Sequence, residues 1–419
     1  MTFAIFLLLM LLSVPIGITL ILSSVFYIWH SDNTVLFASF SQQLFGSVEN
    51  YGLMAIPLFI LAGELMNAGG LTKRLINFAR LFFGGLRGGL AYINLLANML
   101  MAAILGSAVA QIAVMSQSIV PEMEKEGYDK SFATALTAIS GLMGSIIPPS
   151  MMFVIYGVLA QISIGDMFTA GIIPGLLMGL GILVVIFLLG IRHQYPKGQW
   201  PTKSAIWPAC TKALPALSIP VIIIGGILSG WTTPTESAAV ASIVSLFVGL
   251  YVYKELRWVE LPLLLERTAL NTGMVLFLVA AAGVFGWTIT FEQVPQMVAT
   301  WVGQSTSDPF MFMLMVCGLL LLIGTVLDGI AALILVVPIL LPIAVGEFGI
   351  NPFQFGVVIC LVLVLGLLTP PVGTGLFVAS AMTGVPSGRL FKVLLPFLLV
   401  TGAVVVLLSY FPWLSMALL

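Results

Sequence analysis

The same six-residue pattern interrupts two long apolar stretches of this sequence. Residues 144–149 read Gly-Ser-Ile-Ile-Pro-Pro, and residues 366–371 read Gly-Leu-Leu-Thr-Pro-Pro. A proline inside a helix removes one backbone hydrogen bond and clashes with the preceding turn, which costs about 3 kcal/mol. Because lipid cannot satisfy the freed carbonyls, such a break is typical of a helix that lines a polar cavity. Two double prolines at matching places favour this interpretation over simple packing kinks.

The composition around these breaks is that of a membrane protein. The chain has 419 residues, of which 60% are hydrophobic and 7% are charged, and its mean hydropathy is +1.17. A soluble domain carries about a quarter charged residues, so this chain cannot have water as its only solvent. At about 20 apolar residues per span, it can hold roughly ten transmembrane helices and no sizeable soluble domain. The apolar runs do not alternate like barrel strands, which predicts an all-α integral membrane protein.

The linkers between the apolar runs differ in charge. Lys and Arg are concentrated at 73–87, 192–212 and 389–392, whereas the linkers that contain Asp166 and Glu292 are acidic. By the positive-inside rule the basic linkers are cytoplasmic and the acidic linkers lie on the other side. The net charge of −1 gives no support for nucleic-acid binding.

Both assignments of the linkers hold only if two of the apolar runs enter and leave the membrane on the same side. The runs are 89–120 and 309–345, and they are predicted to be re-entrant helical hairpins, the first open to the cytoplasm and the second to the outside. Such opposed elements are typical of an inverted repeat.

Further motifs occur in the same order in both halves. Gly106-Ser107-Ala108-Val109-Ala110 matches Gly324-Thr325-Val326-Leu327-Asp328, and Pro15-Ile16-Gly17-Ile18-Thr19 matches Pro234-Thr235-Glu236-Ser237-Ala238. We therefore predict two inverted repeats. The first covers 1–203, with a hairpin at about 89–120 and a broken helix at about 131–160; the second covers 204–419, with a hairpin at about 309–345 and a broken helix at about 354–381. Pro15 further predicts that the first apolar run forms two short helices.

The breaks and the hairpin tips are the predicted binding regions. Pro149 and Pro371 can each begin a second half-helix, whose free amides and positive dipole end suit a carboxylate, while the loosened carbonyls before it suit a cation. The tips Gly106-Ser107 and Gly324-Thr325 are small and add hydroxyl oxygens. Hard, neutral oxygen ligands fit sodium better than a transition metal. No ATP-binding motif and no His/Cys cluster is present, so we expect an ion gradient as the energy source, no cofactor and no enzymatic activity.

Three acidic residues in or beside apolar runs each have a functional and a structural interpretation. Asp328 either supports a cation site or a proton-coupled position, or it caps local amides; we favour function because an unpaired charge in the membrane costs at least about 2.5 kcal/mol. For Glu64 we favour a structural or domain-contact role. Glu236 follows Thr233 by three residues, which is the spacing of a helix capping box.

The run from Ile56 to Leu71, IPLFILAGELMNAGGL, resembles the first signature of the large membrane subunit (DctM or SiaM type) of tripartite ATP-independent periplasmic (TRAP) transporters. The resemblance covers essentially the whole chain. It continues through Gly106–Ala110, Ile146–Ser150, Thr233–Ala241 and Gly366–Gly373.

The resemblance implies a sodium-coupled importer of an organic acid, such as sialic acid, a C4-dicarboxylate or a sugar acid, in a bacterial inner membrane. It implies membership of the ion transporter superfamily of elevator-type carriers. Two partners are implied as well: a small four-helix membrane subunit of the DctQ or SiaQ type, and a periplasmic binding protein of the DctP or SiaP type. A stand-alone sodium/carboxylate carrier and a non-transporting membrane assembly subunit are the alternatives.

The resemblance also implies site residues. Sodium site 1 is carried onto Gly106, Ser107, Gly144 and Pro148, and sodium site 2 onto Gly324, Thr325, Gly366 and Thr369. The substrate carboxylate is expected at Ser107, Pro149, Ser150, Asp328, Pro371 and Gly373, between the half-helix N-termini. Many members have an acid directly after the alanine that ends the first tip motif, where this chain has Gln111. A charged role is therefore not carried onto that position.

Overall fold

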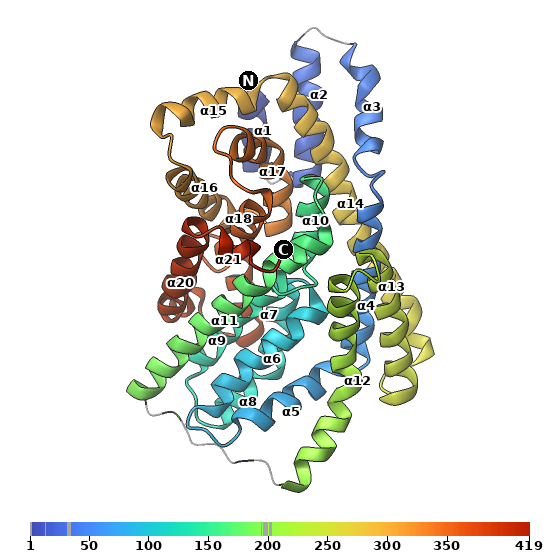
Figure 1. Ribbon diagram of the computed structural model, residues 1–419, viewed down its shortest axis with the longest axis vertical. Coiled ribbons are helices and arrows are strands. Elements are labelled where there is room, and N and C mark those ends of the chain that lie inside the picture. The colour runs from blue at the N-terminus through green and yellow to red at the C-terminus, as the bar shows by residue number, and fades with distance from the viewer. Residues whose placement is uncertain (1, 13, 32–34, 194, 196–199, 201–202) are drawn as a thin grey trace.

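All regular structure in this protein is helical over the residues that its computed structural model describes, 2–419 without 13, 32–34, 194, 196–199 and 201–202 (Figure 1). Parts of the predicted basic linker 192–212 thus lie outside the described residues. Among the described residues, 7 helices are long and apolar enough to cross a membrane, or up to 8 if one pair that is bent by 119° counts as a single span.

This number is lower than the roughly ten spans expected from composition. The reason is that several apolar runs fold into helices too short to cross a bilayer alone, at Ile16–His30, Gly89–Leu105, Pro352–Gly366 and Thr374–Thr383. The first run behaves as predicted. It forms α1 (Thr2–Leu11) and α2 (Ile16–His30), and Pro15 directly precedes α2.

One group of helices, here called the frame, lies along one side of the molecule (Figure 1). At its centre α4 packs against α13 and α14, while α14 also packs against α2 and α3. Next to them α12 packs against α13 and α5. Besides α2, the frame consists of α3 (Leu36–Gly46), α4 (Ala55–Ala68), α5 (Leu71–Phe83), α12 (Lys203–Leu228), α13 (Pro234–Phe247) and α14 (Leu261–Phe291).

The remaining long elements form a second group, here called the bundle. Its members pack mainly against each other. They meet the frame most extensively where α5 packs against α6, and also where α14 contacts α17 and α4 contacts α6. The bundle consists of α6 (Gly89–Leu105), α7 (Ala108–Ser118), α8 (Val120–Lys125), α9 (Lys130–Gly141), α10 (Met151–Leu159), α11 (Ile164–His193), α16 (Pro309–Gly324), α17 (Gly329–Gly346), α18 (Pro352–Gly366), α19 (Thr374–Thr383) and α20 (Ser387–Tyr410). Two smaller helices, α15 (Val294–Ser305) and α21 (Trp413–Met416), lie beside it.

Both double prolines interrupt a helix of the bundle, as the sequence predicts. The first break separates α9 and the short helix η2 (Leu142–Ser145) from α10, and the second separates α18 from α19. Both Pro-Pro peptide bonds are cis.

The basic segment at 73–87 is a helix for most of its length, where we predicted only a linker. In α5 the side chains of Leu71, Leu75, Ile76 and Ala79 are buried, whereas Lys73 is exposed. This spacing of three and four residues is that of an amphipathic helix. The same spacing of apolar residues can be read from the sequence. The Lys and Arg residues between them led instead to the prediction of a linker.

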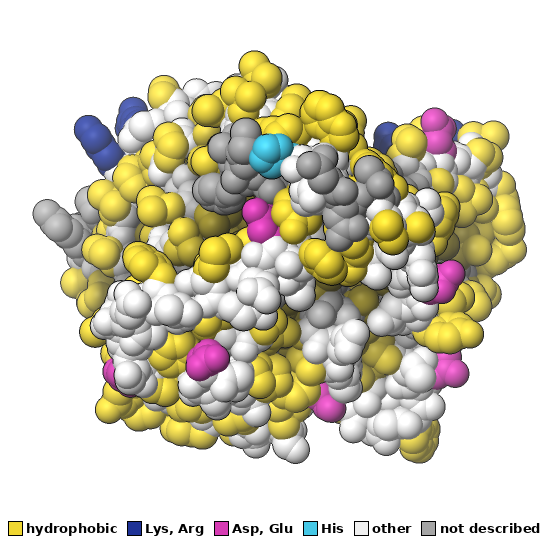
Figure 2. Space-filling model, turned by 90° about the horizontal axis from the view of Figure 1, so that it is seen from above, with side chains coloured by type: hydrophobic (Ala, Val, Ile, Leu, Met, Phe, Trp, Pro, Cys, Tyr) yellow, Lys and Arg dark blue, Asp and Glu magenta, His cyan; other side chains and the backbone are white. Residues whose placement is uncertain are grey.

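Acidic and basic side chains are distributed unequally between the two ends of the molecule. On the face seen in Figure 2, acidic side chains are scattered over the surface, while Lys and Arg show only at its margin. At the opposite end, which holds α5 and α8, Arg80 of α5 pairs with Glu122 of α8 and so joins the frame to the bundle. Exposed pairs of this kind contribute only about 0–1 kcal/mol each.

The predicted capping role of Glu236 is confirmed. Its carboxylate accepts a hydrogen bond from the Thr233 amide (2.8 Å), and the Thr233 hydroxyl accepts one from the Glu236 amide (3.3 Å), so that α13 begins with a capping box. Glu64 is half-buried in α4, and its structural role stays a prediction.

One partly buried hydrogen bond joins the two broken helices and should contribute measurably to stability. The hydroxyl of Tyr156 in α10 donates to the carbonyl of Pro352, the first residue of α18, at 2.5 Å. A Tyr156→Phe variant keeps the ring and loses the bond, so the free energy of unfolding should fall by about 1 kcal/mol. Thermal melting of the purified variant should show a lower midpoint, while Tyr410→Phe, at a ring that is 59% exposed, should melt like the wild type. Equal midpoints for all three proteins would contradict this role.

Candidate functional site

The tip of the first hairpin lies on the first double-proline break. Gly106 follows α6 as its C-cap in the left-handed region (φ +59°), which glycine adopts without a steric penalty, and Ser107 precedes α7 as its N-cap in an extended conformation. Two hydrogen bonds fix the tip: the Met151 amide donates to the Gly106 carbonyl (3.3 Å), and the Ala108 amide donates to the Ser145 hydroxyl (3.0 Å).

Gly144 lies directly against this tip. A Cβ atom at Gly144 would lie 2.5 Å from Gln111 Oε1 and 3.0 Å from the carbonyl oxygen of Ser107. The structure therefore brings together three of the residues predicted for sodium site 1, namely Gly106, Ser107 and Gly144. The fourth, Pro148, lies farther along the same break and is buried.

The tip of the second hairpin contacts the second break even more closely. A Cβ atom at Gly366 would lie 2.6 Å from the carbonyl carbon of Gly324, and the Gly373 amide donates to the Thr325 carbonyl at 2.8 Å. A Cβ atom at Gly373 would lie 2.9 Å from the carbonyl oxygen of Thr369. All four residues predicted for sodium site 2 thus belong to one cluster.

The two clusters correspond and adjoin each other. In each half the amide two residues after the double proline, at Met151 or Gly373, donates to a carbonyl of the hairpin tip. The halves are also interleaved, because α7 of the first hairpin packs against α19, and α17 of the second hairpin packs against α10.

The residues predicted for the substrate divide between the two clusters. Ser150 caps α10, since its hydroxyl accepts from the Phe153 amide (3.4 Å) and donates to the Ser145 carbonyl (2.5 Å). Asp328 caps α17 by accepting from the Ile330 amide at 3.1 Å. The capping interpretation of Asp328 is therefore seen directly, and its functional role stays a prediction. The remaining substrate residues lie beside these two, with Ser107 and Pro149 at the first tip and break, and Pro371 and Gly373 at the second break.

Neither cluster contains a basic side chain. No charged residue is among the fully buried residues that the structure describes, and no group of three or more His, Cys, Asp or Glu side chains in the described ranges could hold a metal ion. A bound carboxylate would have to be neutralised by helix dipoles and by cations. The available cation ligands are backbone carbonyls, hydroxyls and amide oxygens, together with the Asp328 carboxylate at the second tip.

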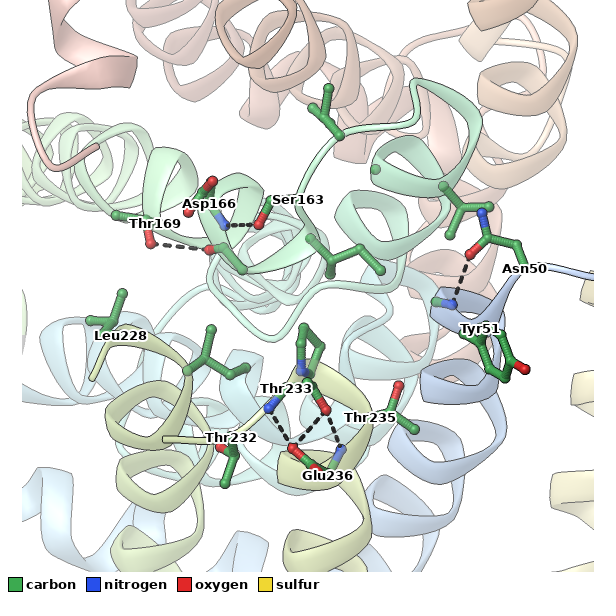
Figure 3. A pocket seen from close by; sticks show the side chains of 18 of the residues that line it. Asn50, Tyr51, Ser163, Asp166, Thr169, Leu228, Thr232, Thr233, Thr235 and Glu236 are labelled. Atoms are coloured by element: carbon green, nitrogen blue, oxygen red, sulfur yellow. Dashed lines mark hydrogen bonds between the residues drawn. The ribbon is translucent and has the colours of Figure 1, made fainter. Parts of the chain in front are cut away.

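An open cavity of about 950 Å³ lies elsewhere, where the short turn that precedes α4, the start of α11 and the start of α13 meet (Figure 3). Asp166 and Glu236 line it, and no Lys, Arg or His is among its described lining residues. An acidic cavity repels an organic acid. None of the predicted substrate residues lines it, so this cavity does not replace the hairpin tips as the candidate substrate site.

Sequence reasoning missed a set of buried amides behind the first tip. Asn94, Asn98 and Gln111 are fully buried and hydrogen-bonded to one another. The signal that could have revealed them is the spacing of Asn94 and Asn98, which are four residues apart inside an apolar run and so lie on one helix face.

The overall fold is that of a multi-pass membrane protein. It is similar to the solved structure of the YdaH transporter from Alcanivorax borkumensis, with a TM-score of 0.68 and 14% sequence identity over 92% of this chain and 89% of that one. Residues 3–414 match the model of the tripartite ATP-independent periplasmic transporter, DctM component, family. The chain belongs to this family of permeases, which are transporters and not enzymes.

Individual relatives cover nearly the full length. The chain is 40% identical to the C4-dicarboxylate TRAP transporter large permease protein DctM of Pseudomonas aeruginosa, over 91% of this chain and 89% of the relative. It is 37% identical to the sialic acid TRAP transporter large permease protein SiaM of Vibrio cholerae, over 95% and 93%. It is also 37% identical to the 2,3-diketo-L-gulonate TRAP transporter large permease protein YiaN of Escherichia coli, over 89% and 87%.

Proposed function

We propose that this chain is the large subunit of a sodium-driven importer of an organic acid in a bacterial inner membrane. The observation that carries the proposal is the pair of matched clusters in which a hairpin tip contacts a double-proline break and offers oxygen ligands but no basic side chain. The relatives at 37–40% identity are named for C4-dicarboxylate, sialic acid and diketogulonate, all of which are acids.

Sodium is the coupling ion in this proposal, with site 1 at Gly106, Ser107, Gly144 and Pro148, and site 2 at Gly324, Thr325, Gly366 and Thr369. Close packing of the tips against the breaks supports both positions, because carbonyl and hydroxyl oxygens from two chain segments converge there. Bound sodium would supply the positive charge that the clusters lack. The substrate carboxylate then lies between the half-helix N-termini, at Ser107, Pro149, Ser150, Asp328, Pro371 and Gly373.

The two hairpins are re-entrant in this proposal, and the halves 1–203 and 204–419 are inverted repeats. The course of the chain supports this. Both α5, which precedes the first hairpin, and α8, which follows it, lie at one end of the molecule, whereas α15, which precedes the second hairpin, lies at the opposite end (Figure 1). The concentration of basic residues in α5 supports a cytoplasmic position for the first of these ends.

Transport occurs by an elevator movement, in which the bundle slides along the frame. Support comes from the division of the helices: both clusters are built entirely from bundle elements, so that the bundle can carry both sites as one body. A small membrane subunit braces the frame, and a periplasmic binding protein delivers the acid.

The sodium dependence of uptake tests the proposal. The chain would be reconstituted into liposomes with its small subunit and binding protein, and supplied with labelled sialic acid, a C4-dicarboxylate or a sugar acid. With two sodium ions per substrate, an inward sodium gradient of about tenfold can drive roughly hundredfold accumulation. Equal uptake when potassium replaces sodium on both sides of the membrane would disprove sodium coupling.

A further inference from the structure

The side-chain oxygen of Gln111 is buried without a hydrogen-bond partner among the described residues. The side chain is fully buried in α7, four residues after the first hairpin tip. Its Nε2 atom donates to the carbonyl oxygen of Asn98 (2.7 Å) and to Asn98 Oδ1 (2.9 Å). Its Oε1 atom is buried and has no hydrogen-bond partner among the described residues. An unpaired buried amide oxygen is unfavourable unless something else binds it.

The orientation of this amide is fixed by a chain of hydrogen bonds. Thr137 Oγ1 donates to the Ala133 carbonyl (2.8 Å) and accepts from Asn94 Nδ2 (2.7 Å). Asn98 Nδ2 in turn donates to the carbonyl oxygen (2.9 Å) and to Oδ1 (2.7 Å) of Asn94. Since a backbone carbonyl can only accept, each amide nitrogen must face the next residue of the chain. Gln111 Oε1 therefore has to point away from Asn98.

The direction in which it points is the first hairpin tip. A Cβ atom at Gly144 would meet both Gln111 Oε1, at 2.5 Å, and the Ser107 carbonyl oxygen, at 3.0 Å. Two oxygens from α7 and its N-cap thus converge over the Cα atom of a glycine in the break. Any larger residue at position 144 would occupy the space that these oxygens share.

We propose that Gln111 Oε1 is a further ligand of the cation in the first site, together with the Ser107 carbonyl. This inference rests on the proposed sodium-coupled function and adds to it a side-chain ligand that carries no charge. An amide oxygen is a hard ligand that suits an alkali or alkaline-earth cation.

Equilibrium binding of radioactive sodium to the full chain in lipid nanodiscs tests the proposal. Gln111→Met removes the oxygen at nearly constant volume, and we expect the affinity of one sodium site to fall by about tenfold or more while the other site is unchanged. Gln117→Met makes the same replacement at an exposed position of the same helix and should bind sodium like the wild type. Gln111→Asn keeps the amide but withdraws its oxygen by about one C–C bond, roughly 1.5 Å, and should weaken the same site.

The possible results separate this inference from the proposed function. Two intact sites in Gln111→Met would overturn the role of Gln111 and leave sodium coupling in place. If Gln111→Met does not fold, intact binding in Gln111→Asn has the same meaning. A wild-type chain that binds no sodium would overturn the proposed function itself, and this inference with it. Loss of one site in both Gln111 variants, with Gln117→Met unaffected, supports the assignment.

Discussion

Replacing Gly366 with alanine should abolish sodium-driven uptake. The added methyl group would lie 2.6 Å from the carbonyl carbon and 2.7 Å from the Cα atom of Gly324, and both of these atoms belong to the backbone. A backbone cannot move aside as the end of a flexible side chain can, so the hairpin tip must separate from the break. Overpacking of this kind typically costs about 1–3 kcal/mol. Here the distortion falls on the oxygens that are proposed to bind the second sodium ion.

Gly318→Ala is the matched control for this variant. Gly318 lies in α16, the same helix that ends at Gly324, and a Cβ atom there has no neighbour within 4 Å. Alanine is a better helix former than glycine by up to about 1 kcal/mol, so this control should be at least as stable as the wild type. Uptake into liposomes and thermal melting would be measured for both variants. Wild-type uptake by Gly366→Ala would show that close contact between tip and break is not required.

The interruptions in the helices were the most predictable part of the fold. Pro148 and Pro370 are each followed by a second proline, which no continuous helix accommodates, so the breaks followed from local chemistry alone. Contacts between the two halves were harder to predict from the sequence. That α7 packs against α19 and α10 against α17 depends on how the halves interleave, and an apolar run contains no signal for its partner.

The predicted residues that the structure brings together are those whose identity is itself unusual. Gly106 is needed for its left-handed backbone, and glycines at 144, 324 and 366 leave room for the close approach of each tip to its break. Gln111 could not be recognised in this way. Its importance depends on an unpaired atom, and pairing is known only once Asn94, Asn98 and Thr137 are placed around it.

Asp328→Asn should reduce sodium-dependent uptake by about tenfold or more without a loss of stability. The residue has two roles that this substitution separates. As a helix cap, Asp328 accepts a hydrogen bond from the Ile330 amide at 3.1 Å, and asparagine caps a helix about as well as aspartate. As a charge, Asp328 lies at the second hairpin tip, three residues after Thr325, where a carboxylate can balance a bound cation.

The chain contains a matched control for this kind of cap on the neighbouring helix. Asp308 precedes α16 and accepts from the Phe310 amide at 3.2 Å, so its side chain bonds the amide two residues ahead, as that of Asp328 does. Asp308 is remote from the tips, at the other end of its helix. Both Asn variants should therefore melt like the wild type, and Asp308→Asn should also transport like it. If Asp328→Asn retained full uptake, capping would account for this acid, and the cation at the second site would be held by neutral oxygens alone.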